Sequence, residues 1–323
     1  MTTSALGARR TFASAYWVTM RPYLLPVSGA SGLVGLAMVD ALPTSRVAVG
    51  FAAFTLAYGF GQALTDVTQV DTDALSAPYR PLVSGELRRR DVLVASGAGL
   101  ALCASALFVL SPWTLALAAL SVAGLATYTS MKRRFWAGPA HNSWIVALLP
   151  AMGALSSRES IGTTLRSPIV WAAMASVFFS YATFVLLGYL KDVEADRTTG
   201  YRTLPVRFGR PITVAVSALC AALALVASLA MVSRTATAST PSSIVGGIAW
   251  LIGASMLVAA HLRARTITRD QEAHLAIATC VRGFVALHLA EATLLRPTFA
   301  VLAVVVYVAF ELALAARPCK EQV

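Results

Sequence analysis

The chain has 323 residues, of which 57% are hydrophobic and only 13% are charged, whereas soluble domains carry about 25% charged residues. This composition excludes an ordinary soluble globule. The net charge of +11 does not indicate a nucleic-acid-binding protein, because the basic residues cluster in short segments between long apolar runs, as they do in membrane proteins. We therefore expect the partner of this chain to be the lipid bilayer and not a nucleic acid.

Long apolar runs recur along the whole sequence, each close to the roughly 20 residues that a helix needs to cross a bilayer. We predict nine spans, near residues 23–41, 47–64, 92–110, 113–130, 139–156, 168–190, 212–232, 243–262 and 297–316. A tenth segment, 272–293, contains ionisable residues such as Arg282 and Glu291, which are costly in lipid. It is expected to span against other helices or to lie partly at the interface. The predicted fold is an all-α membrane bundle of nine or ten helices.

The distribution of basic residues predicts how the chain is oriented. If the N-terminus is cytoplasmic, most lysines and arginines fall in connections on the cytoplasmic side, as the positive-inside rule requires. The N-terminal segment is basic but has no early apolar core that ends in a cleavage site, so we expect no removable signal peptide. These features predict one domain, residues 1–323, in the cell inner (plasma) membrane.

Acidic residues gather in two of the connections, 65–91 and 191–211. The first loop contains Asp66, Asp71 and Asp73, and the second contains Asp192 and Asp196. The loops follow the second and the sixth predicted span, so four crossings separate them and both open on one side, which the charge distribution makes cytoplasmic. The stretches TDVTQVDTDALSAPYRPLVSG and KDVEADRTTGYRTLPVRFG also form a weak repeat, which either duplication or two independent uses of one chemistry would produce.

The spacing within each loop predicts which carboxylates act together. If the preceding helix continues through Asp73, then Asp66, Gln69 and Asp73 share one face, whereas Asp71 points away from it. Asp192 and Asp196 are four residues apart and share a face in the same way, with Tyr189 one turn earlier. Each loop is therefore expected to present a pair of carboxylates.

Paired carboxylates suit Mg²⁺, which is usually held by one or two carboxylates together with water and phosphate oxygens. Cations that adjoin these loops would bind the phosphate itself. The candidates are Arg80, Lys132, Lys191 and Arg202. An arginine near a span is more often a topology determinant and a lone aspartate more often a helix cap, but four aspartates on two helix faces favour a diphosphate site.

These motifs resemble the UbiA superfamily of intramembrane prenyltransferases. The family motif NDxxDxxxD followed by an RP step is similar to Thr65–Asp73 followed by PYRPLVSG, and the KDxxxD motif is similar to Lys191–Asp196 followed by RTTGYRTLP. The residues of both motifs are most similar to those of the branch that contains chlorophyll synthases and homogentisate prenyltransferases. The Arg21-Pro22 step before the first span fits the family as well.

The resemblance implies a bundle of about nine spans around a lateral cavity, with the diphosphate bound through Mg²⁺ between the two motifs. It assigns the catalytic and metal-binding roles by position. The residues so assigned are Asp66 and Asp73 in the first motif, Asp192 and Asp196 in the second, Lys132 as a cation for the diphosphate, and Tyr128 and Tyr189 as weaker candidates.

Two positions depart from the family pattern. Thr65 stands where the family has asparagine, and Gln69 stands where it has the middle aspartate. Gln69 offers a metal only an uncharged carbonyl oxygen and would bind it more weakly. Asp71 is a substitute ligand if the helix unwinds locally.

The predicted activity is Mg²⁺-dependent transfer of an isoprenyl chain from its diphosphate to an aromatic or similar electron-rich acceptor. The alternative is a membrane terpene cyclase of the same superfamily, which needs no acceptor. A transporter with cation-binding loops is disfavoured, because transporters place ionisable groups near the membrane midplane, whereas these acidic residues gather at one face.

Overall fold

The computed structural model describes residues 10–157, 160–234 and 241–317. Within these residues every predicted span contains a helix. The long helices are α2 (Leu25–Ala37), α3 (Thr44–Asp66), α5 (Arg89–Leu110), α6 (Trp113–Arg134), α7 (Gly138–Ala154), α9 (Pro168–Gly188), α12 (Arg210–Val232), α13 (Pro241–Ala264), α14 (His274–Leu295) and α15 (Ala300–Ala315). The all-helical fold class is therefore confirmed.

Eight helical segments in the described part of the chain are long and apolar enough to cross a membrane. The other two long helices, α2 with 13 residues and α7 with 17, are shorter than that. Almost every residue of α2 is buried by its neighbours, so this helix lies inside the bundle. About 20 residues are needed by a helix that crosses the hydrocarbon core on its own. A helix that other helices surround can be shorter.

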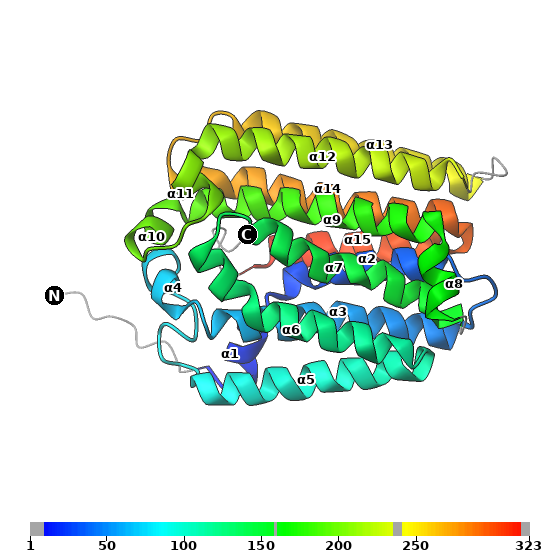
Figure 1. Ribbon diagram of the computed structural model, residues 1–323, viewed down its shortest axis with the longest axis horizontal. Coiled ribbons are helices and arrows are strands. Elements are labelled where there is room, and N and C mark those ends of the chain that lie inside the picture. The colour runs from blue at the N-terminus through cyan, green and yellow to red at the C-terminus, as the bar shows by residue number, and fades with distance from the viewer. Residues whose placement is uncertain (1–9, 158–159, 235–240, 318–323) are drawn as a thin grey trace.

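The two ends of the bundle carry different short helices, as Figure 1 shows. The helices α4 (Val70–Ser76), α10 (Val193–Thr198) and α11 (Leu204–Phe208) lie at one end, and α8 (Ile161–Arg166) lies at the other. The helices α4 and α10 come from the two acidic loops. The two loops thus open on the same side, as their separation by four crossings predicted.

The tenth predicted segment forms α14, which lies against other helices with most of its length buried. Its buried ionisable groups His288 and Glu291 are paired. His288 Nδ1 lies 2.8 Å from Glu291, His288 Nε2 lies 2.8 Å from the Ser180 hydroxyl, and Ser176 donates a 2.6 Å hydrogen bond to Glu291. This fully buried network joins α14 to α9, as polar side chains do between membrane helices.

Two helices approach each other closely because glycine removes the side chain at their contact. A Cβ at Gly35 of α2 would lie 2.0 Å from the carbonyl oxygen of Pro150 in α7, and a Cβ at Gly153 would lie 2.6 Å from the carbonyl oxygen of Gly32. Such distances are too short for real atoms, so a larger residue would force α2 and α7 apart.

We expect Gly35→Ala to lower the free energy of unfolding by about 1–3 kcal/mol, the usual effect of overpacking a close contact. The matched control is Gly247→Ala, since a Cβ at Gly247 meets no atom within 4 Å. Thermal unfolding in detergent would measure both variants. Equal melting temperatures would contradict the close contact between α2 and α7.

Candidate active site

The first acidic motif is not one continuous helix, and the prediction that the helix runs through Asp73 is wrong. The helix α3 ends at Asp66 and α4 begins at Val70. The Thr68 hydroxyl donates a 2.8 Å hydrogen bond to the Thr65 carbonyl and lies 2.7 Å from the Thr129 hydroxyl of α6. Such side-chain bonds compete with the helical backbone pattern. The chain therefore turns at Gln69 before α4 starts.

The second acidic motif breaks in the same way. A short 3₁₀ turn, Tyr189–Lys191, follows α9, and Asp192 then precedes α10 with φ −117° and ψ 14°, almost the values of Gln69 (−116° and 14°). The amide of Asp196 donates to the carbonyl of Asp192 at 2.8 Å, and the amide of Asp73 donates to that of Gln69 at 2.9 Å. Gln69 thus occupies in the first motif the backbone position that Asp192 occupies in the second.

Two arginines neutralise the carboxylates of the first motif. Arg21 donates to both oxygens of Asp66 at 2.9 and 3.0 Å, and Arg80 lies 2.5 Å from Asp73 and 4.0 Å from Asp66. Arg21 has φ 52°, a backbone conformation that is uncommon outside glycine. Its Nη2 alone bridges both oxygens of Asp66, a charge-assisted contact that stabilises this conformation at the point where the chain enters the bundle.

A lysine neutralises the second motif. Lys132, near the end of α6, lies 3.2 Å from Asp196, and both side chains are buried, with 5% and 0% of their surface exposed. The ammonium group also lies over the rings of Tyr189 and Tyr201, 5.1 and 5.0 Å from their centroids. Charge pairing and the aromatic faces together stabilise a cation that burial alone would disfavour.

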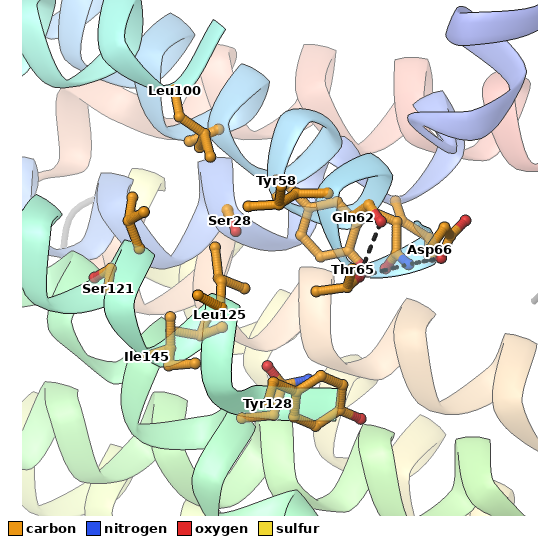
Figure 2. A pocket seen from close by; sticks show the side chains of 18 of the residues that line it. Ser28, Tyr58, Gln62, Thr65, Asp66, Leu100, Ser121, Leu125, Tyr128 and Ile145 are labelled. Carbon is orange, nitrogen blue, oxygen red and sulfur yellow. Dashed lines mark hydrogen bonds between the residues drawn. The ribbon is translucent and has the colours of Figure 1, made fainter. Parts of the chain in front are cut away.

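A cavity of about 830 Å³ opens beside these charges. Its walls come mainly from α3, α5, α6, α7 and α9. Figure 2 shows Gln62, Thr65 and Asp66 of α3 on one side of it and Tyr128 of α6 on another. The rest of the wall is largely apolar, and it includes Leu115, which is 49% exposed. The cavity therefore extends from the charged end along apolar residues of α5 and α6.

Most of the predicted site residues line this cavity. They are Asp66, Gln69, Asp73, Arg80, Tyr128, Lys132, Tyr189, Lys191 and Asp192. Segments more than a hundred residues apart in the sequence are thus brought to one place. The hydroxyls of Tyr128 and Tyr189 lie 2.9 Å apart on the cavity wall.

Three predicted residues lie away from the cavity wall. Asp196 sits behind it, paired with Lys132. Asp71 is half-exposed and binds Arg133 at 2.8 Å, so the unwound helix does not turn it toward Gln69. Arg202 is exposed, and its backbone amide donates a 3.1 Å hydrogen bond to the carbonyl of Arg133. Their predicted roles at the metal or the diphosphate would require the loops to move.

Several lining residues lay outside the prediction. They are Arg21, Tyr58, Gln62, Asn142 and Tyr181. From the sequence, Arg21 is noted only as part of the Arg21-Pro22 step and has no assigned role at the site. The helical spacing of Tyr58 and Gln62 relative to Asp66 could have indicated two of these residues. Tyr58, Gln62 and Asp66 are four residues apart and share a face, and Gln62 donates a 2.7 Å hydrogen bond to Asp66. Arg21 had no such signal, because its contact with Asp66 depends on the tertiary fold.

The pKa values of the two carboxyl groups in the second motif shift in opposite directions. Burial opposes ionisation of Asp192, but the nearby Lys191, Lys132 and Arg80 outweigh it and lower the pKa of its carboxyl. Burial raises the pKa of Asp196 to about 6, although Lys132 partly offsets this effect. Asp192 is therefore the carboxylate of the second motif that is best suited to hold a cation in the cavity.

The oxygen atoms on the cavity wall could bind Mg²⁺ if phosphate oxygens supply part of its coordination shell. Asp66, Gln69, Asp73 and Asp192 all present oxygen donors there, the ligand type that Mg²⁺ prefers. Within the residues that the structure describes, no three Asp, Glu, His or Cys side chains form a group able to hold a metal. The donor set therefore suits a Mg²⁺ ion that is bound by these side chains together with phosphate oxygens. It does not suit a metal that is bound by protein side chains alone.

The fold and the site together define an intramembrane enzyme with paired acidic motifs above an apolar cavity. Residues 23–280 match the UbiA prenyltransferase family, and the chain belongs to this family. The predicted family and enzyme class, a prenyltransferase, are thereby confirmed.

Named relatives and solved structures agree with this assignment. A digeranylgeranylglyceryl phosphate synthase of Natronomonas pharaonis is 30% identical over 203 residues, 62% of this chain and 70% of the relative. The enzyme of that name from Halobacterium salinarum is 32% identical over 207 residues, 62% and 71% of the two chains. By name, neither relative belongs to the chlorophyll synthase or homogentisate branch, which the residues of the two motifs resemble.

The fold is also similar to solved UbiA homologues. The apo structure of a homologue from Aeropyrum pernix K1 has a TM-score of 0.70 at 20% identity, over 86% of this chain and 98% of that one. A homologue from Archaeoglobus fulgidus bound to GPP and Mg²⁺ has a TM-score of 0.60 at 16% identity, over 86% and 99% of the two chains. These likenesses establish the shared fold.

Proposed function

We propose that this enzyme transfers an isoprenyl chain from its diphosphate to an electron-rich acceptor in a reaction that requires Mg²⁺. The observation that carries the proposal is a single cavity with a charged end and an apolar remainder. The charged end suits a diphosphate and the apolar remainder suits a long hydrocarbon chain. The Archaeoglobus fulgidus homologue, which binds GPP and Mg²⁺, supports this pairing of ligands.

The charges at this end nearly cancel before any ligand binds. The four cations Arg21, Arg80, Lys132 and Lys191 lie beside four of the aspartates, Asp66, Asp73, Asp192 and Asp196. A diphosphate adds an excess of negative charge, which Mg²⁺ held by Asp66, Gln69, Asp73 and Asp192 would neutralise as the leaving group departs. The arginines and lysines would donate hydrogen bonds to the same phosphate oxygens.

The rest of the cavity protects the reactive carbon chain. The apolar side chains of α5 and α6 exclude water, which would otherwise capture an allylic cation. Tyr128 and Tyr189 line the cavity with their hydroxyls 2.9 Å apart, and the ammonium group of Lys132 lies over the ring of Tyr189. Their rings present the electron-rich faces that attract positive charge.

The acceptor is proposed from two lines of support. The motif resemblance favours an aromatic ring, such as a phenol or a quinone precursor. The named relatives are digeranylgeranylglyceryl phosphate synthases, and their similarity favours the hydroxyl of a glyceryl phosphate as the second candidate. Both classes supply a nucleophile that attacks the carbon that the diphosphate leaves, and the proton that the acceptor loses would pass to the released diphosphate or to water.

The test is incubation of purified protein with Mg²⁺ and geranyl, farnesyl or geranylgeranyl diphosphate, first alone and then with each acceptor class. Mass spectrometry would identify the products, and Asp192→Ala would serve as the inactive control. A prenylated acceptor supports the proposal. A cyclic product formed without acceptor would instead identify a terpene cyclase.

Gln69→Asp is expected to retain activity and to lower the Mg²⁺ concentration needed for half-maximal rate by about tenfold, the effect of roughly 1.4 kcal/mol in binding. The reason is that a carboxylate binds Mg²⁺ more strongly than an amide oxygen. A Mg²⁺ titration of the initial rate would measure the change. A folded but inactive variant would show that the amide has a specific role and would contradict the expectation.

We also place the charged end of the bundle at the cytoplasmic face of the plasma membrane. The support is the excess of lysine and arginine in the connections on that side. Accessibility of engineered cysteines near residue 88 to a membrane-impermeant reagent in inverted and right-side-out vesicles would test the orientation.

A further inference from the structure

Two short segments at one end of the bundle together form an exposed patch of arginines and aromatic rings. One segment joins α6 to α7, and the other runs from the loop after α10 through α11, at the end that carries the acidic motifs (Figure 1). Six of their side chains are exposed. They are Arg134, Phe135, Trp136, Arg202, Arg207 and Phe208. We call this set the arginine–aromatic patch.

Contacts between the two segments hold the patch together. The ring of Trp136 meets the ring of Phe208 edge to face at a centroid distance of 5.9 Å, and the ring of Phe135 lies 5.1 Å from that of Trp136. The backbone amide of Arg202 donates a 3.1 Å hydrogen bond to the carbonyl of Arg133. The six side chains therefore belong to one surface, although the two segments are far apart in the sequence.

The positive charge of the patch is not offset by nearby acidic residues of its own segments. Residues 131–140 and 200–212 include no aspartate or glutamate. In the part of the chain that the structure describes, no ion pair involves Arg134, Arg202 or Arg207. The neighbouring Arg133 differs, because it is paired with Asp71. Three guanidinium groups are thus available to an anion from outside the chain.

The aromatic rings place the patch beside the lipid. Phe135, Trp136 and Phe208 are 45%, 43% and 43% exposed. The helices next to the patch, α6 and α12, are apolar and are largely left uncovered by other helices, so their outer faces contact the hydrocarbon core. Exposed tryptophan rings at the ends of such helices lie at the level of the lipid headgroups. The patch therefore lies at the depth of the phosphate groups of the bilayer.

Other basic segments at this end of the bundle have acidic neighbours. The exposed arginines 88–90, where α5 begins, are flanked by Glu86 and Asp91. Arg269 is paired with Glu272. Each of these carboxylates weakens the attraction of its arginines for an anion. Of these basic surfaces, the arginine–aromatic patch best suits a negatively charged headgroup.

We propose that the arginine–aromatic patch binds the headgroup of an anionic phospholipid. The guanidinium groups would donate hydrogen bonds to the phosphate oxygens, and the three rings would pack against the glycerol and the upper part of the acyl chains. Basic clusters next to membrane helices attract anionic lipids in this way. The site lies outside the cavity, and the proposal does not depend on the proposed function.

A bound lipid would also join the second acidic motif to α6. The backbone amide of Tyr201 donates a 2.8 Å hydrogen bond to the carbonyl of Asp196, and the guanidinium of Arg133 lies over the Tyr201 ring, 4.5 Å from its centroid. The loop that contains Arg202 thus starts at the second motif. A headgroup that bridges Arg202 and Arg134 would hold this loop against α6, so its binding is expected to raise the melting temperature.

The test compares the full-length protein in detergent with two triple variants. The patch variant carries Arg134→Gln, Arg202→Gln and Arg207→Gln. The control variant carries Arg88→Gln, Arg89→Gln and Arg90→Gln and loses the same charge from exposed positions at the start of α5. Native mass spectrometry measures binding of phosphatidylglycerol and of phosphatidylcholine with identical acyl chains over a range of lipid concentrations. Melting temperatures without added lipid establish that the proteins are folded.

We expect the unchanged protein and the control variant to bind phosphatidylglycerol about tenfold more tightly than phosphatidylcholine, a difference of roughly 1.4 kcal/mol. The patch variant is expected to bind the two lipids equally. Phosphatidylglycerol should raise the melting temperature of the unchanged protein and the control variant more than that of the patch variant. Glycerol 3-phosphate at the same concentration should not displace the lipid, because it lacks the acyl chains that contact the rings.

Equal binding of the two lipids by the unchanged protein would overturn the proposal, and so would an unaltered preference in the folded patch variant. An equal loss of preference in the control variant would also overturn it, because the attraction would then depend on net charge alone. Displacement by glycerol 3-phosphate would identify a site for soluble anions instead of a lipid. If the patch variant does not fold, Arg207→Gln alone is measured, and an unaltered preference in that variant would contradict the proposal.

Discussion

Asp192→Ala is expected to reduce prenyl transfer by about a thousandfold or more, the equivalent of roughly 4 kcal/mol of transition-state stabilisation. Asp192 lines the cavity at the break before α10. The cations around it lower the pKa of its carboxyl, so it is ionised at neutral pH. Removing it takes away the negative oxygen ligand that the second motif offers to Mg²⁺ in the cavity.

The matched control is Asp71→Ala in the first motif. Asp71 is half-exposed, pairs with Arg133 and does not line the cavity, and an exposed pair of this kind contributes little to stability. We expect near-normal turnover from this variant. The comparison of initial rates requires equal melting temperatures for the two proteins. Substantial activity in folded Asp192→Ala, or loss of activity in Asp71→Ala, would refute the assignment of roles.

Lys132→Met is expected to lower the free energy of unfolding by about 3–5 kcal/mol, because removal of one partner leaves an uncompensated buried charge. Asp196 has none of its side-chain surface exposed and lies 3.2 Å from Lys132. Its carboxyl would then bind a proton or draw water into the loop. Loss of activity should accompany the loss of stability, since Lys132 also lines the cavity.

The double variant Lys132→Met with Asp196→Leu separates these two effects. Replacing both members of a buried pair with apolar residues is often neutral for stability, so we expect the melting temperature to recover while activity stays low. Thermal unfolding in detergent and the initial rate would be measured on the same preparations. An undiminished melting temperature in Lys132→Met alone would show that Asp196 is compensated by another group.

Much of the fold could be predicted from local sequence. Each predicted span contains a helix, because the need to bury backbone polar groups and apolar side chains in lipid leaves helices as the main solution. The common orientation of the two acidic loops followed from counting crossings. The shortness of α2 could not be predicted in this way, since it depends on the helices that cover it.

The candidate site was predicted less completely. The motif aspartates were found because carboxylates are scarce in this chain and stand at regular spacings. The break at Gln69 was missed, because the hydrogen bonds of Thr68 join residues on α3 and α6. The partners Arg21 for Asp66 and Lys132 for Asp196 were also decided by contacts between distant segments.

The sequence by itself determined the class of the protein, its helical spans and the chemical type of its charged groups, because composition and spacing act locally along the chain. Only the tertiary structure decided which of these groups face the cavity. It placed Asp192 on the cavity wall, Asp196 behind it and Asp71 outside it. The reason is that the breaks before α4 and α10 turn neighbouring aspartates in different directions, and the packing of distant helices sets where those breaks fall.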